Sequence, residues 1–173
     1  AETWAPGDPK QDSRMGPVIS DQAWEKIQRL IKSGIADGAT LVTGGDGKPD
    51  GLEHGYFVKP TIFSHVNNEM DIAREEIFGP VLSIIGYDTE DEAIEIANDT
   101  DYGLGGYVQS QDLDRARAVA SKIRAGYISI NNAGMDISVP FGGYKQSGNG
   151  REYGDEAFGE FLEYKSYLGY NPS

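Results

Sequence analysis

The stretch "LSIIGYDTEDEAIEIAN" (residues 82–98) decides the fold class, because a strand and a helix follow each other in it without a long linker. Residues 82–87 form an apolar run that is typical of a buried strand. Thr89 and Glu92 then give the Ser/Thr-x-x-Glu pattern of a capping box, which predicts a helix over residues 90–98. We therefore expect this stretch to be the first half of a strand–helix–strand unit.

The same alternation continues further along the chain. The segment "GYVQS" (residues 106–110) predicts a second strand, and residues 127–130 predict a third. Between them, Asp112 as N-cap and Gly126 as C-terminal stop frame a second helix. Strands that alternate with helices form parallel sheets with right-handed crossovers. The sequence thus predicts an α/β fold with a parallel sheet over residues 82–130.

The sequence before this region predicts one amphipathic helix and several short extended segments. Residues 1–17 are rich in Pro and Gly and are expected to form an irregular lead-in. Apolar residues then recur at helical spacing before Gly38, which is the expected helix stop; they are Trp24, Ile27, Leu30, Ile31 and Ile35. Residues 40–43, 56–58 and 61–66 are expected to be extended.

The C-terminal tail does not follow the strand–helix alternation. After a glycine-rich loop, "FGEFLEYKSYLGY" (residues 158–170) alternates in a way that predicts a strand at about residues 161–166. An arm that pairs with the sheet of another subunit would explain such a strand. A strand that completes the sheet of its own chain would explain the pattern equally well, and the sequence leaves both alternatives open.

Composition excludes several classes of protein. The chain has 28 acidic and 15 basic residues, a net charge of -13, and no cluster of Lys and Arg, which argues against a nucleic-acid surface. It has no apolar run of about 18 residues, the length that a membrane-spanning helix needs. Residues 1–20 lack the pattern of a signal peptide. We therefore expect a soluble, cytoplasmic protein with neither nucleic acid nor membrane as a partner.

Cysteine is absent from the sequence, which excludes disulfides, thiolate metal ligands and cysteine nucleophiles within these 173 residues. The two histidines, His54 and His65, lie in separate predicted elements. Solvated or capping roles suit them better than a metal site, so no metal is expected.

Two adjacent carboxylates stand at an unusual place. Glu75 and Glu76 directly precede the Phe-Gly-Pro turn that leads into the apolar run. A solvated pair of charges costs little free energy, whereas a buried pair needs partners. One explanation is an ion pair between Glu76 and Arg74 at a helix end, and another is a ligand-binding role.

Five motifs occur in a fixed order and together resemble the C-terminal portion of the NAD(P)-dependent aldehyde dehydrogenase superfamily, from about Pro6 onward. They are "MGPVIS" (15–20), "REEIFGPV" (74–81), "DYGLGGYV" (101–108), "PFGGYKQSGNGREYG" (140–154) and "FLEYKS" (161–166). The resemblance implies that residues 1–155 are part of a catalytic domain with its parallel sheet. It also implies that residues 156–173 form an oligomerisation arm whose strand pairs in a homo-oligomer.

The same resemblance implies roles for individual residues. It assigns Glu76 to the two hydroxyls of the nicotinamide ribose and places Phe78 near the nicotinamide. Lys26 matches a position that faces the cofactor, although the solvated side of an amphipathic helix is an alternative. Phe141 resembles an aromatic residue that lines the aldehyde tunnel. Ala23 stands where relatives often carry a Gln or His that helps to hold the ribose, so that half of the site is expected to be weaker.

Further residues are expected to have structural or specificity roles. Arg151 and Glu163 match a pair that joins the glycine-rich loop to the terminal strand in relatives. The segment 132–139 resembles the loop that faces the substrate, and its Met135 and Ile137, without a basic residue, disfavour an acidic aldehyde.

Members of the family oxidise a small-molecule aldehyde to a carboxylic acid with NAD or NADP, through a cysteine thiolate. The resemblance implies that the nucleophile, the general base and the nucleotide-binding domain lie outside these residues, so no residue of this chain is expected to be the catalytic nucleophile or base. We expect a fragment that is inactive alone. The alternative is a non-catalytic oligomerising module derived from that family.

Overall fold

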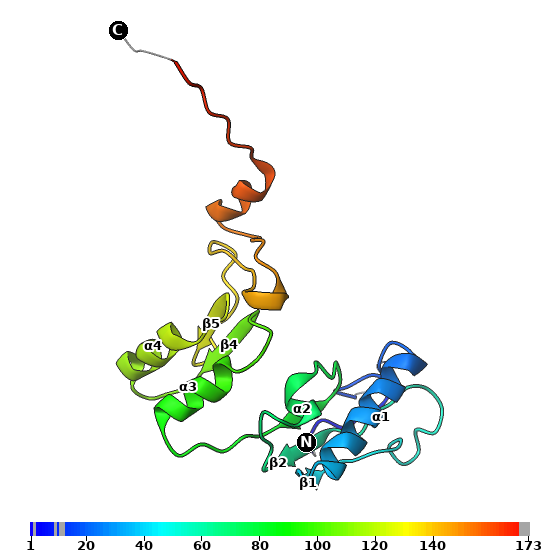
Figure 1. Cartoon of the computed structure of the whole chain (residues 1–173). Coiled ribbons are helices and arrows are strands. Elements are labelled where there is room, and N and C mark those ends of the chain that lie inside the picture. The colour runs from blue at the N-terminus through cyan, green and yellow to red at the C-terminus, as the bar shows by residue number, and fades with distance from the viewer. Residues whose placement is uncertain (2, 9, 11–12, 170–173) are drawn as a thin grey trace. The chain divides into compact units, whose positions relative to one another are not determined.

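The computed structural model describes residues 1, 3–8, 10 and 13–169. The chain divides into two compact units, Ala1–Asp88 and Thr89–Ser173 (Figure 1). Each unit combines helices with a small sheet, and each is described by itself. No helix in the described part of the chain is both long and apolar enough to cross a membrane.

The first unit holds a three-stranded sheet beside one long helix. Its helices are α1 (Asp21–Ala36) and α2 (Asp71–Arg74), and its strands are β1 (Thr40–Thr43), β2 (Thr61–Ser64) and β3 (Val81–Ser83). The strand order is β1-β2-β3, with β2 antiparallel to β1 and parallel to β3.

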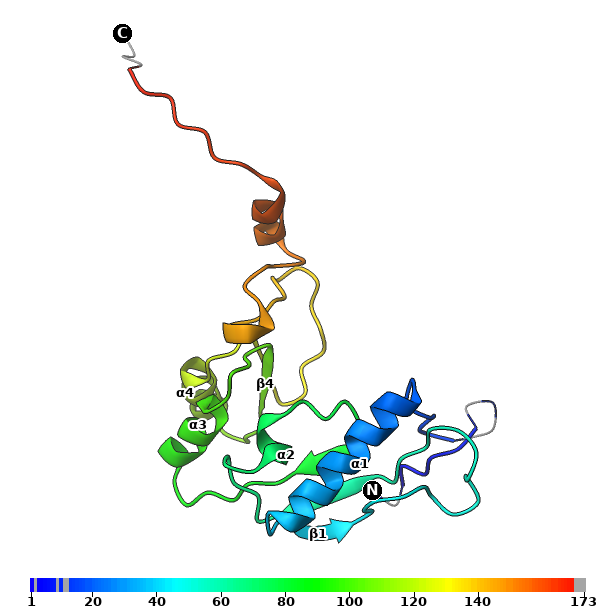
Figure 2. The ribbon, with the colours of Figure 1, turned by 45° about the vertical axis from the view of Figure 1, so that its right-hand side comes forward.

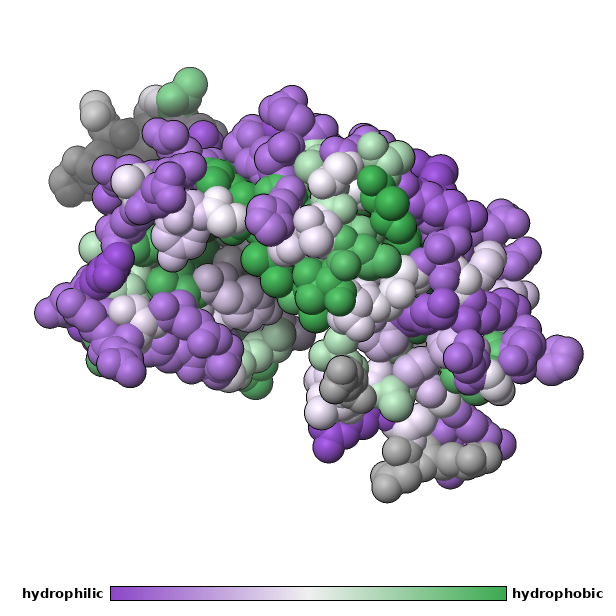
Figure 3. Space-filling model, turned by 90° about the horizontal axis from the view of Figure 1, so that it is seen from below, coloured by the Kyte–Doolittle hydropathy of each residue, from purple (hydrophilic) through white to green (hydrophobic). Residues whose placement is uncertain are grey.

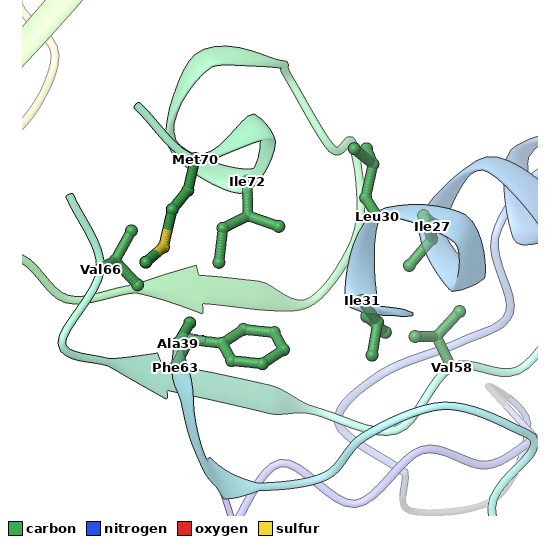
Figure 4. Close-up of a cluster of buried hydrophobic side chains, with 9 residues drawn as sticks. All are labelled: Ile27, Leu30, Ile31, Ala39, Val58, Phe63, Val66, Met70 and Ile72. Atoms are coloured by element: carbon green, nitrogen blue, oxygen red, sulfur yellow. The ribbon is translucent and has the colours of Figure 1, made fainter. Parts of the chain in front are cut away.

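The core of this unit lies between α1, α2 and the central strand β2 (Figure 4). Helix α1 contributes Ile27, Leu30 and Ile31, whose spacing places them on one face of the helix, as the sequence predicts. Phe63 of β2 and Ile72 of α2 complete the contact, and the ring of Phe63 is fully buried. Helix α1 thus supplies three of the nine buried residues of this core cluster, and the sheet, α2 and the adjoining loops supply the others.

The second unit contains the predicted parallel strand pair. Its elements are α3 (Glu90–Asn98), β4 (Gly105–Val108), α4 (Leu113–Lys122), β5 (Tyr127–Ile130) and the 3-10 helices η1 (Lys145–Ser147) and η2 (Asp155–Phe161). The strands β4 and β5 pair in parallel, with α4 as the crossover between them.

Both predicted helix starts of the second unit are confirmed. Thr89 Oγ1 accepts from the Glu92 backbone N–H at 3.2 Å, and Glu92 Oε2 accepts from the Thr89 N–H at 3.4 Å, which completes the capping box. Asp112 Oδ1 accepts from the backbone N–H groups of Asp114 and Arg115, both at 3.0 Å. The α4 helix ends at Lys122, before the Gly126 stop that the sequence predicts.

The α/β class is confirmed, but the predicted single sheet over residues 82–130 is wrong. Strand β3 pairs with β2 in the first unit, whereas β4 and β5 form a separate two-stranded sheet in the described residues. The reason is that β2, β3 and the helices around them already enclose a core of their own. Helix α3 follows the boundary between the units and is not a crossover within one sheet.

The tail differs from the strand that the sequence predicts. Residues 155–161 form η2, and residues 162–169 are extended without strand pairing to any described residue (Figures 1 and 2). The side chains of Tyr164 and Leu168 are 100% and 95% exposed. A strand that completes the sheet of its own chain is thus not formed among the described residues.

Apolar side chains also reach the surface elsewhere. Figure 3 shows apolar atoms gathered in patches on a face that is otherwise largely hydrophilic. In the first unit the exposed apolar side chains include those of Val42, Leu82 and Ile84, which lie on or beside the sheet. Patches of this kind often mark contact surfaces.

Candidate functional site

The segment 76–80 is fixed to the core of the first unit on both sides. Ile77 packs against the core cluster, and Gly79 lies so close to α1 that a Cβ there would stand 2.6 Å from Ile27 Cδ1. The carbonyl of Pro80 accepts a hydrogen bond from the Thr61 N–H at 2.8 Å. Only a residue without a side chain fits between this turn and the helix, which explains the glycine in Phe-Gly-Pro.

Glu76 is held by its backbone and leaves its carboxylate unengaged. The Lys26 ammonium donates to the Glu76 carbonyl oxygen at 2.6 Å, which ties the segment to α1. The Glu76 side chain is exposed, and within the described residues its carboxylate has no hydrogen-bond or ion-pair partner. The structure thus brings Lys26 and Glu76 together, with the ammonium at the backbone.

The neighbouring charges have other partners. Glu75 forms an ion pair with Arg29 of α1 at 3.3 Å, and Arg74 lies 3.7 Å from Glu69. The ion pair between Glu76 and Arg74 that the sequence allows is therefore not formed. Of the two adjacent carboxylates, one is a surface ion-pair partner and the other remains available for a ligand.

Phe78 occupies a backbone conformation that a bulky residue rarely adopts. Its φ is +55°, and the residue is 78% exposed. A left-handed conformation of this kind costs about 1 kcal/mol or more and persists where the surrounding structure imposes it. Here the turn between Ile77 and Gly79 imposes it, and the result is an aromatic ring presented to the outside beside Glu76.

Phe141 belongs to the second unit, where it lines a cavity of about 250 Å³. Its backbone is fixed by two hydrogen bonds with Glu152, from N–H to carbonyl in each direction, at 2.7 and 2.8 Å. Its ring lies 5.4 Å from the ring of Tyr127 and 6.4 Å from that of Tyr153, measured between centroids. The predicted substrate-lining residue is thus part of an aromatic wall.

Arg151 holds the glycine-rich loop that follows Phe141. Its Nη1 donates to the carbonyl oxygens of Gly143, Asn149 and Gly150 at 2.9–3.0 Å. Glu163 is exposed, and the two side chains do not form the predicted pair in the part of the chain that the structure describes. The guanidinium therefore stabilises its own loop.

Asp136 is a cavity residue that the sequence analysis missed. It stands between Met135 and Ile137 in the predicted substrate-facing loop and lines the same cavity as Phe141. Its Oδ1 accepts from the Ser138 hydroxyl at 2.6 Å and from the Ser138 N–H at 2.9 Å. These hydrogen bonds hold the pKa of Asp136 below its usual value. The Asp-x-Ser spacing was the signal that could have indicated it.

No cluster of three or more His, Asp or Glu side chains that could hold a metal ion occurs among the described residues. Glu76 and Phe78 carry groups that could contact a nicotinamide nucleotide. A carboxylate without an internal partner can accept from both hydroxyls of a ribose, and an exposed ring can pack against the nicotinamide.

A comparison with known protein families identifies the family of the chain. The sequence profile of the aldehyde dehydrogenase family matches residues 1–167. The chain belongs to the aldehyde dehydrogenase family.

Several aldehyde dehydrogenases resemble the chain closely. The 3-succinoylsemialdehyde-pyridine dehydrogenase of a Pseudomonas species is 58% identical over 168 residues, which are 96% of this chain and 35% of that protein. Aldehyde Dehydrogenase C of Pseudomonas syringae, solved as a mutant with NAD+ and octanal, has 51% identity and a TM-score of 0.94 over 99% of this chain and 36% of its own. The aldehyde dehydrogenase of Mycobacterium tuberculosis, solved with NAD+, has 44% identity and a TM-score of 0.90, with 99% and 36% covered. The chain thus spans about a third of the length of these relatives.

The strained backbone of Phe78 gives a testable prediction for this aldehyde dehydrogenase chain. Phe78→Val and Phe78→Gly both remove the ring, but valine is β-branched and glycine tolerates φ +55°. We expect the free energy of unfolding of the valine variant to be lower by about 1–2 kcal/mol than that of the glycine variant. Both tryptophans lie in the first unit, so urea unfolding followed by tryptophan fluorescence reports on this unit alone. Equal stabilities would show that the turn does not impose the conformation.

The cavity of this aldehyde dehydrogenase chain contains a hydrogen-bonded pair of tyrosines. The hydroxyls of Tyr107 and Tyr127 lie 2.9 Å apart, and their rings meet edge to face. The hydrogen bond with Tyr107, followed by burial, raises the pKa of Tyr127 above the ordinary 10.0.

The direction of this shift predicts a pH dependence. The pKa of Tyr127 is higher in the folded than in the unfolded chain, so the protonated hydroxyl stabilises the folded state. This contribution to the free energy of unfolding is complete below pH 10.0 and is lost as the pH rises through the raised pKa. Tyr107→Phe should return the titration of Tyr127 toward the ordinary value. The 13Cζ NMR signal of Tyr127 in tyrosine-labelled protein is assigned by its absence from the Tyr127→Phe variant. This signal measures the titration of Tyr127 in the unaltered chain and in the Tyr107→Phe variant. An unchanged Tyr127 titration in the Tyr107→Phe variant would contradict the assignment.

Proposed function

We propose that the chain supplies the nicotinamide-facing and substrate-facing walls of an enzyme that oxidises an aldehyde to a carboxylic acid with NAD+. The observation that carries this proposal is the unpartnered carboxylate of Glu76 beside the exposed ring of Phe78, on a segment fixed to the core. Relatives solved with NAD+, one of them also with octanal, support the cofactor and the substrate class. The cofactor accepts the hydride that leaves the substrate carbon.

Each residue of the proposed cofactor site has a distinct role. The two oxygens of Glu76 accept hydrogen bonds from the two hydroxyls of the nicotinamide ribose. Phe78 packs beside the nicotinamide and limits its orientation. Lys26 is a positioning residue, because its ammonium fixes the Glu76 carbonyl and leaves the carboxylate free. Phe141 lines the space for the aldehyde in the second unit.

The chain itself supplies no thiolate, because it contains no cysteine. The proposal therefore places the nucleophile, the general base and the nucleotide-binding domain in other parts of the enzyme. In this view the chain corresponds to the C-terminal third of an aldehyde dehydrogenase, with residues 1–155 in its catalytic domain and residues 156–173 as the oligomerisation arm. The isolated chain is then inactive toward aldehydes.

Two measurements test the proposal. The first is NADH formation by the concentrated chain with NAD+ and a panel of aldehydes, where no turnover above the blank is expected. Turnover that survives repeated purification would overturn the proposed thiolate mechanism.

The second measurement tests the cofactor site directly. Binding of nicotinamide mononucleotide to the chain is followed by saturation-transfer NMR. We expect Glu76→Gln to weaken binding about fivefold, since a hydrogen bond to a charged group contributes about 1 kcal/mol or more. Glu75→Gln is the matched control, because Glu75 pairs with Arg29 and should leave binding unchanged. Equal effects of the two variants would remove Glu76 from the cofactor site.

One observation favours a second function. Residues 162–169 are extended and carry exposed apolar side chains, as an arm that joins copies of the chain would. A non-catalytic oligomerising module is therefore the alternative. Sedimentation equilibrium distinguishes the two, because a module forms defined oligomers whereas a fragment of an enzyme forms monomers or aggregates.

A further inference from the structure

The cavity around Phe141 is lined mostly by apolar residues together with three aromatic ones, and one of its described lining residues is charged. Tyr107, Tyr127 and Phe141 form one side, and Met135 and Val139 contribute aliphatic surface from the loop. Among the described residues that line the cavity, Asp136 is the one charged residue, and none is Lys, Arg or His. A volume of about 250 Å³ is smaller than most sites for whole drug-sized ligands, so the cavity suits one part of a molecule.

The carboxylate of Asp136, an exposed residue, is held by hydrogen bonds at one of its two oxygens. Oδ1 of Asp136 accepts from both the hydroxyl and the backbone N–H of Ser138, which leaves Oδ2 without a partner in the described part of the chain. Two hydrogen bonds to one oxygen stabilise the ionised carboxylate and restrict its rotation. The electron-rich faces of the nearby aromatic rings repel anions and attract cations. The rings and Asp136 therefore both favour a cationic ligand over an anionic one.

From this combination we infer that the cavity takes the tail of the aldehyde and that Asp136 selects it by charge, favouring uncharged or cationic tails over tails that carry a carboxylate. The inference rests on the proposed function for the identity of the ligand as an aldehyde. The selection itself follows from electrostatics: an anionic tail would meet a like charge with no basic residue among the lining residues to offset it. Asp136 thereby becomes the specificity-determining residue of the cavity.

The test uses three probes of nearly the same shape and different charge: choline, 3,3-dimethylbutan-1-ol and 3,3-dimethylbutanoate. The chain has three methionines, and of these Met135 lines the cavity whereas Met15 and Met70 belong to the first unit. The NMR signals of 13C-labelled methionine methyl groups therefore report binding at the cavity with two internal controls. We expect choline and the alcohol to shift the Met135 signal. The carboxylate should bind about tenfold more weakly than the alcohol, because both Asp136 and the faces of the aromatic rings repel it.

Asp136→Asn isolates the effect of the charge, because an asparagine oxygen can still accept both hydrogen bonds from Ser138. In this variant the carboxylate probe should bind about threefold more tightly and choline about threefold more weakly, with the alcohol unchanged. Asp101→Asn is the control, since it makes the same change of net charge in the same unit at an exposed residue outside the cavity lining.

Three outcomes would overturn the inference: no shift of Met135 with any probe, an Asp136→Asn variant with an unchanged order of affinities, or an equal effect of Asp101→Asn. The probes are not aldehydes, and the measurement requires neither cofactor nor turnover. If the probes showed no charge selection while nicotinamide mononucleotide still bound in a way that depends on Glu76, charge selection alone would be refuted. Charge selection without mononucleotide binding would refute the proposed function alone.

Discussion

Replacement of Phe63 by alanine is expected to lower the free energy of unfolding of the first unit by about 4 kcal/mol, because truncating a buried phenylalanine removes apolar contacts and leaves a cavity. Phe63 is fully buried on the central strand, where its ring meets side chains from both helices (Figure 4). A unit of this size has about 5–10 kcal/mol of stability in total, so the variant should retain only about 1–6 kcal/mol.

Urea unfolding followed by tryptophan fluorescence measures this loss in the first unit. The control in the same unit is Ile19→Ala, which truncates an apolar residue that is 93% exposed. The control should change the stability by less than about 0.5 kcal/mol. A loss below about 1 kcal/mol for Phe63→Ala would mean that the packing in Figure 4 does not hold the unit together.

Replacement of Gly126 by alanine is expected to have the largest effect in the second unit. Gly126 donates its N–H to the Gly103 carbonyl at 2.9 Å, and a Cβ at this position would overlap the carbonyl oxygen of Gly142. Both segments at the contact are backbone, so neither can move aside by a change of rotamer. We expect a loss of about 3 kcal/mol and a displacement of the segment that carries Phe141.

Hydrogen exchange resolved along the chain separates this loss from changes in the first unit. A weaker nuclear Overhauser effect between the rings of Phe141 and Tyr127 would report the displacement. Gly159→Ala is the control, because a Cβ there meets no atom within 4 Å. If Gly126→Ala left both the exchange and the ring contact unchanged, the close backbone approach would be wrong.

The sequence predicted those features that depend on neighbouring residues. The capping box at Thr89 and the N-cap at Asp112 are confirmed, because a cap is decided by the side chain and the next three residues. The buried face of α1 is confirmed for Ile27, Leu30 and Ile31 for the same reason, whereas Ile35, which the spacing places on that face, is 44% exposed.

Features that depend on distant contacts were beyond the sequence. Strand β3 was assigned to the wrong sheet, because an apolar run does not show which strand it will pair with. The left-handed turn at Phe78 depends on the approach of Gly79 to Ile27 of α1. Asp136 was passed over because its Asp-x-Ser spacing indicates only a local turn. The spacing does not show that the loop folds against the strands β4 and β5 and lines a cavity.

The extended segment 162–169 also has a practical consequence. Proteases cut where several consecutive residues can enter the active-site cleft in an extended form, and this segment presents such a substrate without any need for local unfolding. Brief digestion should therefore trim the chain here first, at Tyr164, Lys165, Tyr167 or Leu168, and leave every helix and strand of both units intact. Protection of the same bonds in a longer enzyme would provide a direct footprint of the surface on which the arm rests.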